Sequence, residues 1–261
     1  MYLAGRNGVK RGGRVLLIGA GPGDPELLTL KAVRALATAD VVLVDDLVSR
    51  AVLVHLSPAA RVVEVGKRGG CRSTPQAFIE RLMLRLARAG NVVARVKGGD
   101  PFMFGRGGEE MLVLRQAGIE CEVIPGITAG MAVPATCGIP VTHRAMARGV
   151  TFVTGHSSDG RAPDWTHLAA SGTTLVIYMG MMQLAAICAA LLDAGMRPDM
   201  PAAVIEQGTL PAQREIMATL TTLASRATAE KIRSPAIIVI GDVVALAHSQ
   251  RSEAPAMERA A

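Results

Sequence analysis

The chain has 261 residues, of which half are apolar, and its formal net charge at pH 7 is +6. This length suits one large α/β domain or two smaller ones, and the apolar content is sufficient for a sizeable core. Because no apolar run approaches the roughly 18 to 20 residues that cross a bilayer, we expect a soluble protein without a membrane-spanning segment.

The positive charge comes mostly from arginine, and aromatic residues are scarce: four Phe, two Tyr and one Trp. Unpaired bases would find few aromatic side chains to stack on, and no basic helix is present, so we do not expect nucleic acid as a partner. Arginine is suited instead to planar carboxylates, which it binds through two parallel hydrogen bonds. A solvated basic surface is the alternative explanation of the same composition.

The cysteines and the N-terminus favour a cytoplasmic protein. The four cysteines lie far apart, without a C-x-x-C pair or the spacing to histidine that metal ligands show. We therefore expect small buried thiols in a reducing compartment and no metal site. The basic start and the apolar run 15–18 look faintly like a signal peptide, but the run ends at Gly19 and is too short for one.

The first half of the chain alternates apolar runs with helical patterns. Asp24 before Pro25 is typical of a helix start, and Ser73 with Gln76 three residues later forms a capping-box pattern. Such alternation predicts parallel strands joined by crossover helices, with ligands bound beyond the carboxyl ends of the strands. The expected strands are 14–21, 40–46, 92–96 and 119–126, and the expected helices are 24–39 and 73–90.

The second half predicts another α/β segment after a connection at 138–149, which is rich in turn residues and charge. The two strands within 202–219 are expected to be antiparallel and to lie at a sheet edge. We therefore expect an N-terminal α/β domain at 14–142, which carries the glycine-rich loops on the substrate side, and a C-terminal α/β domain at 150–247. Flexible tails are expected at 1–13 and 248–261, and strands at 150–155, 173–180, 202–208, 214–219 and 235–246.

The first strand ends in the motif GAGPGD at 19–24, which invites comparison with dinucleotide-binding proteins. Asp45 and Asp46 end the next strand, about where a ribose-binding acid would lie. The fingerprint G-x-G-x-x-G is nevertheless incomplete, because Asp24 replaces the third glycine and Pro22 stiffens the turn. A carboxylate there competes with pyrophosphate for the same backbone amides, and no P-loop motif occurs. A nucleotide-binding oxidoreductase stays as an alternative.

Two short polar motifs follow, DDLVS at 45–49 and GKR at 66–68. Asp45 at a strand end can serve as a general base toward a cleft, and a nearby lysine such as Lys67 can hold a carboxylate or donate a proton. A loop carboxylate that caps the following turn is the alternative for an isolated aspartate.

The densest cluster of glycines is KGGDPFMFGRGGEE at 97–110. Gly98 and Gly99 let the backbone come near a ligand without side-chain obstruction. Asp100 precedes a proline and is held extended, which would present its carboxylate outward to a ribose hydroxyl pair or an amino group. Met103 adds an apolar wall. We interpret this loop as part of a binding site.

The same loop ends in a turn that presents an arginine. The surrounding glycines predict a tight turn that aims Arg106, and Glu109 and Glu110 then open a helix with charge favourable to its dipole. Ordering so many unconstrained residues costs entropy, which favours a use beyond structure.

A run of small residues at 125–140 predicts a short helix, with Thr128 at or near its N-cap and Ala129 behind it. A flat ligand could lie against this shallow wall. Close packing of the helix on a sheet explains the small residues as well.

Taken together, these motifs resemble the uroporphyrinogen-III C-methyltransferases, a group within the tetrapyrrole methylase family that uses S-adenosylmethionine. The likeness extends from about residue 14 to residue 246. The phrase GGDPF-x-FGRGGEE is specific to this group, whereas the later precorrin methylases and diphthine synthase share the fold and the GPGD turn. The resemblance is carried by VLLIGAGPGDPELLTLKA, VGKR, VKGGDPFMFGRGGEE, VIPGITA, GIPVTHR, VTFVTGH, YMGM and SPAIIVIG.

The resemblance implies two α/β domains of the tetrapyrrole methylase type, with the active site in the cleft between them and the C-terminal domain completing the donor site. It implies transfer of methyl groups from S-adenosylmethionine to C-2 and C-7 of uroporphyrinogen III, which gives precorrin-2 via precorrin-1 and releases S-adenosylhomocysteine. It further implies a cytoplasmic homodimer, whose product could feed sirohaem, cobalamin or haem d1 biosynthesis; the sequence does not distinguish these pathways. A later precorrin methyltransferase or a diphthine synthase is the alternative within the same fold.

The resemblance also assigns roles to individual residues. Asp45 matches the proposed proton acceptor, Lys67 the proposed proton donor, and Arg106 an arginine that handles the substrate. Val44 stands where the family often has an aromatic residue, and GGCRST at 69–74 replaces a more polar turn. The residues that match the family's donor-binding positions are Pro22, Gly98, Gly99, Asp100, Met103, Thr128, Ala129, Met179 and Gly208.

Overall fold

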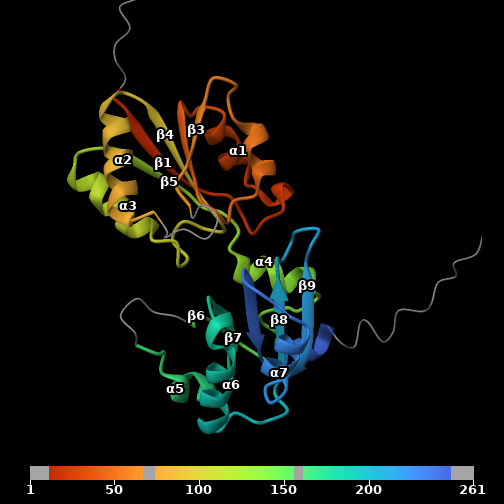
Figure 1. The fold of residues 1–261 in the computed structure, drawn as a ribbon. Coiled ribbons are helices and arrows are strands. Elements are labelled where there is room, and N and C mark those ends of the chain that lie inside the picture. The colour runs from red at the N-terminus through yellow and green to blue at the C-terminus, as the bar shows by residue number, and fades with distance from the viewer. Residues whose placement is uncertain (1–11, 67–73, 156–160, 248–261) are drawn as a thin grey trace, which may run out of the picture. The chain divides into compact units, whose positions relative to one another are not determined.

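The computed structural model describes residues 12–66, 74–155 and 161–247. Contacts between Cα atoms divide the chain into two compact units, Met1–Thr128 and Ala129–Ala261, each with its own five-stranded sheet (Figure 1). The predicted pair of α/β domains is confirmed. The expected connection at 138–149 falls inside the second unit, and the expected tails lie almost entirely outside the described residues. Within the described ranges, no helix is both long and apolar enough to span a bilayer.

Unit 1, Met1–Thr128, is a parallel α/β sheet covered on both faces. Its strands are β1 (Arg14–Gly19), β2 (Val41–Val44), β3 (Arg61–Glu64), β4 (Val92–Lys97) and β5 (Glu120–Ile124). Its helices are α1 (Leu30–Leu36), α2 (Gln76–Arg88) and α3 (Gly107–Gln116), with the 3-10 turns η1 (Pro25–Leu27) and η2 (Arg50–His55). The strand order is β3-β2-β4-β1-β5, and each neighbouring pair is parallel, as the sequence predicts.

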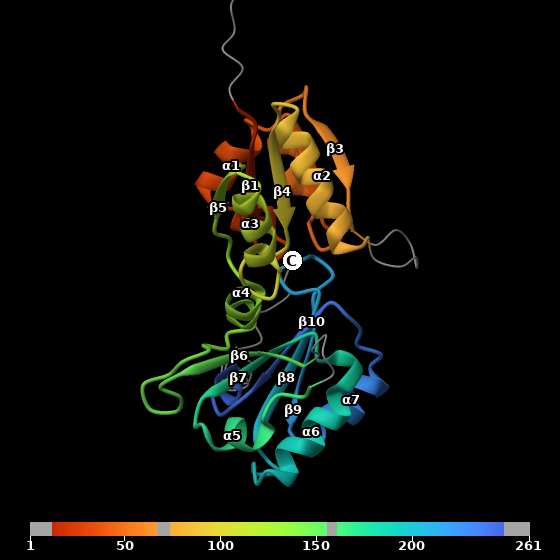
Figure 2. The same ribbon diagram turned by 90° about the vertical axis from the view of Figure 1, so that its left-hand side faces the viewer.

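Alternation along the strands of unit 1 produces two apolar layers. Leu16 and Ala94 belong to the layer that packs against α1 and η2, whereas Leu17 and Val93 belong to the layer that packs against α2 and α3. Figures 1 and 2 show α1 on one face of this sheet and α2 with α3 on the other. Because all neighbouring strands of this sheet are parallel, the carboxyl ends of all five lie at one edge of it.

The helix predicted at 24–39 is interrupted. Asp24 caps only the 3-10 turn η1, where its Oδ1 accepts a backbone N–H at 2.9 Å. The backbone at Leu28 is extended, and α1 then begins with a cap of its own, in which the Thr29 Oγ1 accepts from the Ala32 N–H at 3.1 Å. A threonine that satisfies the free amides of a helix start outweighs the continuous apolar stripe.

Two further details of unit 1 differ from the predictions. Helix α2 begins at Gln76, its N-cap is Pro75, and no side chain caps it; Ser73, the expected cap, lies outside the described residues. Strand β3 is not predicted by the sequence. It has four residues at the sheet edge, mostly exposed, so no buried periodicity marks it.

Unit 2, Ala129–Ala261, holds a mixed sheet. Its strands are β6 (Val150–Thr154), β7 (Thr174–Tyr178), β8 (Pro201–Glu206), β9 (Arg214–Thr219) and β10 (Ala236–Ile240). Its helices are α4 (Ala129–Thr136), α5 (Trp165–Ala170), α6 (Leu184–Asp193) and α7 (Leu223–Ala229), with the 3-10 turn η3 (Met181–Gln183). The order is β6-β7-β10-β8-β9, in which β6 and β7 are parallel and the other neighbours antiparallel. The predicted antiparallel edge pair is confirmed as β8 and β9.

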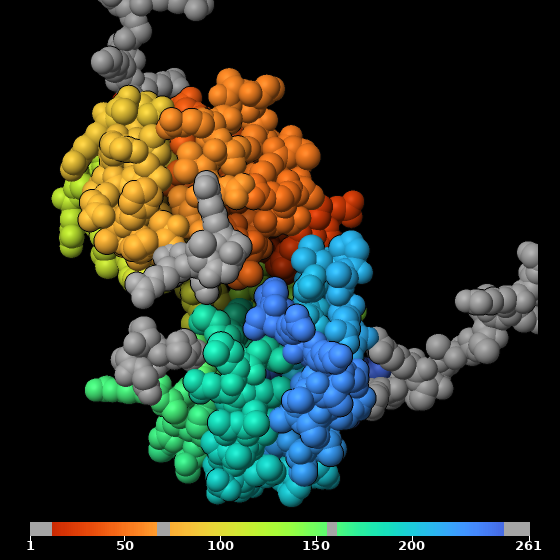
Figure 3. Space-filling model, in the orientation of Figure 1, coloured from red at the N-terminus to blue at the C-terminus, as the bar shows by residue number. Residues whose placement is uncertain are grey.

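The sheet of unit 2 is also covered on both faces. Helices α6 and α7 pack on one face through Ile187, Leu191 and Leu223. Helix α4 packs on the other face, where Val133 joins the cluster that contains Val176. Figure 3 shows α6 and α7 side by side on the visible surface of this unit, in turquoise and blue.

Two cysteines, the buried Cys188 and the half-buried Cys121, are expected to react slowly. Burial raises the pKa of the Cys188 thiol on α6 from 9.0 to about 11, and that of Cys121 on β5 likewise to about 11. Because the thiolate is the nucleophile, this shift alone lowers the reactive fraction at pH 8 about a hundredfold. Mass spectrometry after iodoacetamide treatment should therefore show Cys188 unmodified in the native protein and modified in urea. Equal modification in both states would contradict the burial.

Candidate functional site

Three strand ends of unit 1 meet through backbone contacts between glycines. Gly21 and Gly99 form an isolated bridge, with N···O distances of 3.2 and 2.6 Å. A Cβ at Gly126 would lie 2.2 Å from the carbonyl oxygen of Gly99 and 2.8 Å from Gly19. The ends of β1, β4 and β5 can therefore come this close only because glycines stand there.

The predicted donor-binding residues Pro22, Gly98 and Gly99 lie at this junction. Pro22 sits in the turn after β1, between the bridged Gly21 and the next glycine of the motif. Gly99 has φ of +66°, a conformation that costs other residues energy. A Cβ at Gly98 would meet Leu47 Cβ at 3.0 Å, in the loop after β2. The structure thus brings the loops after β1, β2 and β4 together.

Asp100 ties two of these loops. Its Oδ1 accepts the Phe102 N–H at 2.8 Å, and its Oδ2 accepts the Gly126 N–H at 3.1 Å. The sequence led us to expect a carboxylate presented outward to a ligand. In the structure both oxygens bind backbone amides, so the residue fixes the loop after β4 to the loop after β5. Met103 follows in the same turn, and its N–H donates to the Asp100 carbonyl at 3.3 Å.

Arg106 starts helix α3 with a left-handed backbone, φ +58° and ψ 12°. Its guanidinium is half exposed and binds Glu109, with Nη2 2.6 Å from Oε2. This bond raises the pKa of Arg106 and lowers the pKa of Glu109. Uncommon backbone conformations of this kind cluster at functional sites, and the exposed guanidinium is available to a second carboxylate if it exchanges partners.

Replacing Arg106 should test the side chain apart from its backbone. We expect Arg106→Ala to lower kcat/KM for the substrate that the resemblance implies about 10- to 100-fold, the effect of losing one charged hydrogen bond of about 1.5–3 kcal/mol. Arg106→Gly should lose the same activity while removing the backbone strain. Steady-state kinetics and thermal melts measure both. Full activity in Arg106→Gly would show that the guanidinium has no role.

Asp45 follows β2 and meets two cations of β4. Its Oδ2 lies 2.9 Å from Arg95 Nη2 and 3.7 Å from Lys97 Nζ. Helix α3 supplies the second anion, since Glu110 Oε1 lies 3.1 Å from Arg95 Nε and 3.4 Å from Lys97 Nζ. The four charges balance, and we call this set, Asp45, Arg95, Lys97 and Glu110, the charged cluster.

The charged cluster lies almost entirely inside unit 1. Arg95, Lys97 and Glu110 are buried, and Gln76 at the start of α2 donates to Glu110 Oε1 at 3.1 Å. Burial, followed by the charge of Arg95, lowers the pKa of Lys97, while Glu110 and Asp45 oppose the shift. Among the described residues, Glu110 Oε2 has no hydrogen-bond partner although it is buried.

Lys67, the predicted proton donor, lies outside the described residues. The last described residue before it is Gly66, at which a Cβ would lie 2.0 Å from Asp46 Oδ1. The loop after β3 thus reaches the loop after β2, which begins at Asp45.

In unit 2 the predicted donor-binding residues gather around helix α4. Its first residue is Ala129, directly after the buried Thr128. The Gly130 N–H donates to the Tyr178 hydroxyl at 2.6 Å, so the helix start lies at the end of β7, where Met179 follows. A Cβ at Gly208 would lie 2.3 Å from a methyl group of Val133.

The strand ends on which Met179 and Gly208 lie point the same way. Strands β7 and β8 are each antiparallel to β10 between them, so their carboxyl ends share one edge. Met179 has φ of +54° and is half exposed, and Gln207 and Thr209 around Gly208 also have positive φ. Unusual backbone at both strand ends is consistent with a binding edge.

A basic loop of unit 2 surrounds an open hollow of about 420 Å³. His143 N–H donates to the Ala147 carbonyl at 2.8 Å, which closes the loop into a turn. Arg144 and Arg148 are exposed at its rim. The sequence interpretation of this segment as a connection between the domains did not foresee a turn that presents two guanidiniums.

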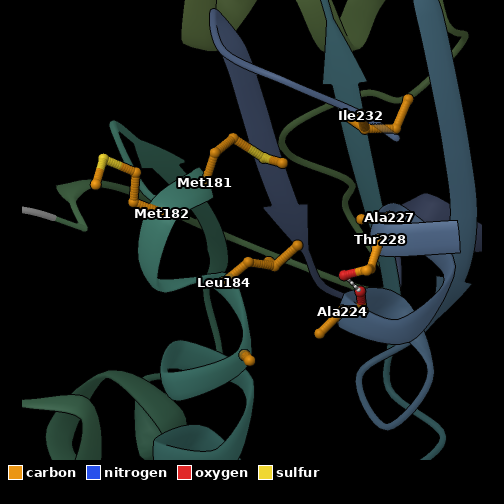
Figure 4. A pocket seen from close by; sticks show the side chains of 8 residues that line it. Met181, Met182, Leu184, Ala224, Ala227, Thr228 and Ile232 are labelled. Atoms are coloured by element: carbon orange, nitrogen blue, oxygen red, sulfur yellow. Dashed lines mark hydrogen bonds between the residues drawn. The ribbon is translucent and has the colours of Figure 1, made fainter. Parts of the chain in front are cut away.

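A smaller hollow of unit 2, about 220 Å³, lies between η3, α6 and α7 (Figure 4). Apart from Thr228, its lining side chains are apolar. The Thr228 hydroxyl donates its proton to the Ala224 carbonyl of its own helix at 2.9 Å. None of the predicted site residues within the described ranges lines this hollow.

Sequence reasoning missed Arg95, Lys97 and Glu110 as a set. A signal was present, because Arg95 and Lys97 interrupt an otherwise apolar strand at positions i and i+2, on one face. Within residues 12–66, 74–155 and 161–247, no group of three or more His, Cys, Asp or Glu side chains could hold a metal ion.

Comparisons with known proteins agree on one family. Residues 14–224 match the family model described as Tetrapyrrole (Corrin/Porphyrin) Methylases. The uroporphyrinogen-III C-methyltransferase of Pseudomonas aeruginosa is 59% identical over 231 residues, 88% of this chain and 94% of that protein. The S-adenosyl-L-methionine-dependent uroporphyrinogen III methyltransferase of Methanosarcina barkeri is 48% identical over 237 residues, 90% of this chain and 93% of that protein.

A solved structure adds a bound ligand. The uroporphyrin-III C-methyl transferase of Thermus thermophilus, crystallised with S-adenyl homocysteine, has a TM-score of 0.78 to this chain at 43% identity. The match covers 90% of this chain and 100% of that one.

Proposed function

The chain belongs to the tetrapyrrole (corrin/porphyrin) methylase family, and from this premise we infer that it transfers methyl groups from S-adenosylmethionine to uroporphyrinogen III. The products are precorrin-2, methylated at C-2 and C-7 and formed via precorrin-1, and S-adenosylhomocysteine. The observation that carries this conclusion is 59% identity to a uroporphyrinogen-III C-methyltransferase over nearly the full length of both chains. The S-adenyl homocysteine in the Thermus structure supports the same donor.

Methyl transfer from this donor depends more on the alignment of the reacting atoms than on activation of the donor. The sulfonium of the donor is already a strong electrophile, so the carbon–sulfur bond breaks as the ring carbon forms its new bond to the methyl group. Electrons from the pyrrole nitrogen drive this attack, and the nitrogen then gives up its proton. The protein must align the three reacting atoms, exclude water and accept that proton.

We propose that the donor is held largely by backbone. The strand ends of unit 1 offer amides and carbonyls at Gly98 and Gly99, and the edge of unit 2 offers those at Met179 and Gly208. Tight glycine contacts in unit 1 support this proposal because they fix the loops before a ligand arrives. The full set of proposed contacts is Pro22, Gly98, Gly99, Asp100, Met103, Thr128, Ala129, Met179 and Gly208.

We propose that Asp45 accepts the pyrrole proton and that Lys67 donates a proton where the reaction needs one. Asp45 is the most exposed member of the charged cluster, with 32% of its side chain accessible, which suits a base that meets a ligand. Arg106 and Arg144, both exposed, are proposed to bind acetate and propionate groups of the substrate. Arg50, an exposed arginine in the 3-10 turn after β2, is paired with Glu64 instead.

An anaerobic assay tests the function. Purified protein, S-adenosylmethionine and uroporphyrinogen III should yield S-adenosylhomocysteine and a product heavier by two methyl groups. Parallel reactions with a later precorrin and with the diphthine precursor should give no product. Methylation of either of those acceptors in place of uroporphyrinogen III would overturn the assignment.

A cytoplasmic homodimer is proposed on the resemblance to the family alone. Light scattering during size-exclusion chromatography measures the mass in solution, and a value near 27.2 kDa, the mass of one chain, would contradict the dimer.

A further inference from the structure

We propose that Arg95 is a positioning residue for the methylation reaction: buried on the face of β4 that α2 and α3 cover, it orients the Asp45 carboxylate toward the substrate and is itself held by Glu110. This inference rests on the proposed function, in which Asp45 accepts the proton. It adds a residue to which neither the sequence motifs nor the resemblance assigns a role.

The register of the sheet places Arg95 where it can reach Asp45. Strands β2 and β4 are neighbours in which Leu43 pairs with Arg95, and the Asp45 N–H donates to the Val96 carbonyl at 3.2 Å. Arg95 shares its face of β4 with Val93, which packs against α2 and α3. Its side chain therefore runs beneath the helices toward the strand ends.

The guanidinium of Arg95 bonds in two directions. Nη2 donates to Asp45 Oδ2 at 2.9 Å, and Nε donates to Glu110 Oε1 at 3.1 Å. A guanidinium is planar and rigid, so fixing one edge on Glu110 fixes the direction of the other. Within the described part of the chain, the Asp45 side chain bonds to Arg95 and Lys97 through Oδ2, so Oδ1 can serve as the second acceptor.

The burial of Arg95, Lys97 and Glu110 argues against a purely structural role for these charges. The side chains of Arg95 and Lys97 are 2% and 5% accessible, and that of Glu110 is 0%. Well-packed apolar side chains of similar volume are often at least as stable as such buried ions. Glu110 also keeps one oxygen without a partner among the described residues. Because these buried charges are expected to add little to stability, and because they lie at the edge of the sheet where ligands bind, we expect them to serve a binding or catalytic site.

The charged cluster has one exposed end. Asp45 is accessible to 32%, whereas its three partners are inside. The hydrogen bonds therefore form a chain from the interior to the surface. Gln76 and Arg95 bond to Glu110, and Arg95 also bonds to the solvent-exposed Asp45. Lys97, at 3.7 Å from Asp45, adds positive charge, but its ammonium group lacks the planar geometry by which a guanidinium orients a carboxylate.

A double-mutant cycle tests the proposal. Arg95→Met keeps the length of the side chain and removes its donors, and Asp45→Asn removes the base. With uroporphyrinogen III, Arg95→Met is expected to lower kcat about 10- to 100-fold, at or below the smaller end of what a positioned acid–base group contributes, because the Asp45 carboxylate is still present. The double variant should be no slower than Asp45→Asn within about threefold. The KM for S-adenosylmethionine and the affinity for S-adenosylhomocysteine should change less than threefold, because Arg95 bonds to Asp45, Glu110 and Val96 and to none of the proposed donor contacts.

Each outcome decides the question. If the two losses in kcat multiply, Arg95 does not act through Asp45 and the proposal is overturned, as it is if Arg95→Met keeps the wild-type kcat. Should Arg95→Met fail to fold, Arg95→Lys replaces it in the cycle, because lysine keeps the charge without the fork. This variant is expected to lower kcat several-fold when Asp45 is present and less than about twofold when it is combined with Asp45→Asn. Failure of the proposed function is distinct, because the wild-type protein would then not methylate uroporphyrinogen III.

Discussion

The substitution Asp45→Asn is expected to lower kcat for uroporphyrinogen III methylation at least about a hundredfold, the smaller end of what a positioned general base contributes. Asparagine keeps an oxygen that can accept from Arg95 Nη2, which lies 2.9 Å from the carboxylate in the wild-type protein. It cannot take a proton from the pyrrole nitrogen. Stopped-time measurements of S-adenosylhomocysteine release under anaerobic conditions give kcat directly.

The matched control for this variant is Asp40→Asn. Asp40 lies at the other end of the same strand, where its Oδ2 accepts the Val92 N–H at 2.7 Å, and asparagine can make that bond as well. It should keep wild-type kcat. Calorimetry should show both variants binding S-adenosylhomocysteine like the wild type. A hundredfold loss of kcat in the control would show that the loss in Asp45→Asn is not specific to the base. An unchanged kcat in Asp45→Asn would show that Asp45 has no role in the mechanism.

The fold could be predicted from the sequence wherever burial left a periodic trace. Buried runs such as Val15–Ile18 and Ile237–Ile240 are apolar on both faces and stand between glycine or proline turns. Strand β3 left no such trace, because it lies exposed at the edge of its sheet. The break after Leu28 was equally hidden, since a single threonine cap decides it against a continuous helical stripe.

The site could be predicted only where its residues are contiguous in sequence. The glycine loops were recognised as close-approach segments, but the partners of that approach are other loops: Gly126 comes near Gly99, and Asp100 binds backbone amides. The charged cluster could be inferred only in part. Arg95 and Lys97 stand out on one face of an apolar strand, but Asp45 and Arg95 are 50 positions apart and meet only through the register of two strands. Registers depend on tertiary packing, which a pattern within one strand does not contain.

The substitution Gly126→Ala tests whether glycine contacts hold the ends of β1, β4 and β5 together. The new Cβ would lie 2.2 Å from the Gly99 carbonyl oxygen and 2.8 Å from Gly19. Both neighbours are backbone and cannot rotate away, so the strand ends must separate. Overpacking typically costs about 1–3 kcal/mol and occasionally more, and we expect about 3 kcal/mol here. In a chain of this size that lowers Tm by about 6–12 °C, which differential scanning calorimetry resolves.

The same variant should weaken donor binding beyond its effect on stability. The Gly126 N–H donates to Asp100 Oδ2 at 3.1 Å, so separating the loops also releases Asp100 beside Gly99. Gly108→Ala is the control, since nothing lies within 4 Å of its Cβ position, and alanine in the first turn of α3 should leave Tm unchanged or raise it. If Gly126→Ala has the same Tm and the same affinity for S-adenosylhomocysteine as this control, glycine contacts do not hold the strand ends together. The donor site proposed at these strand ends would then be contradicted.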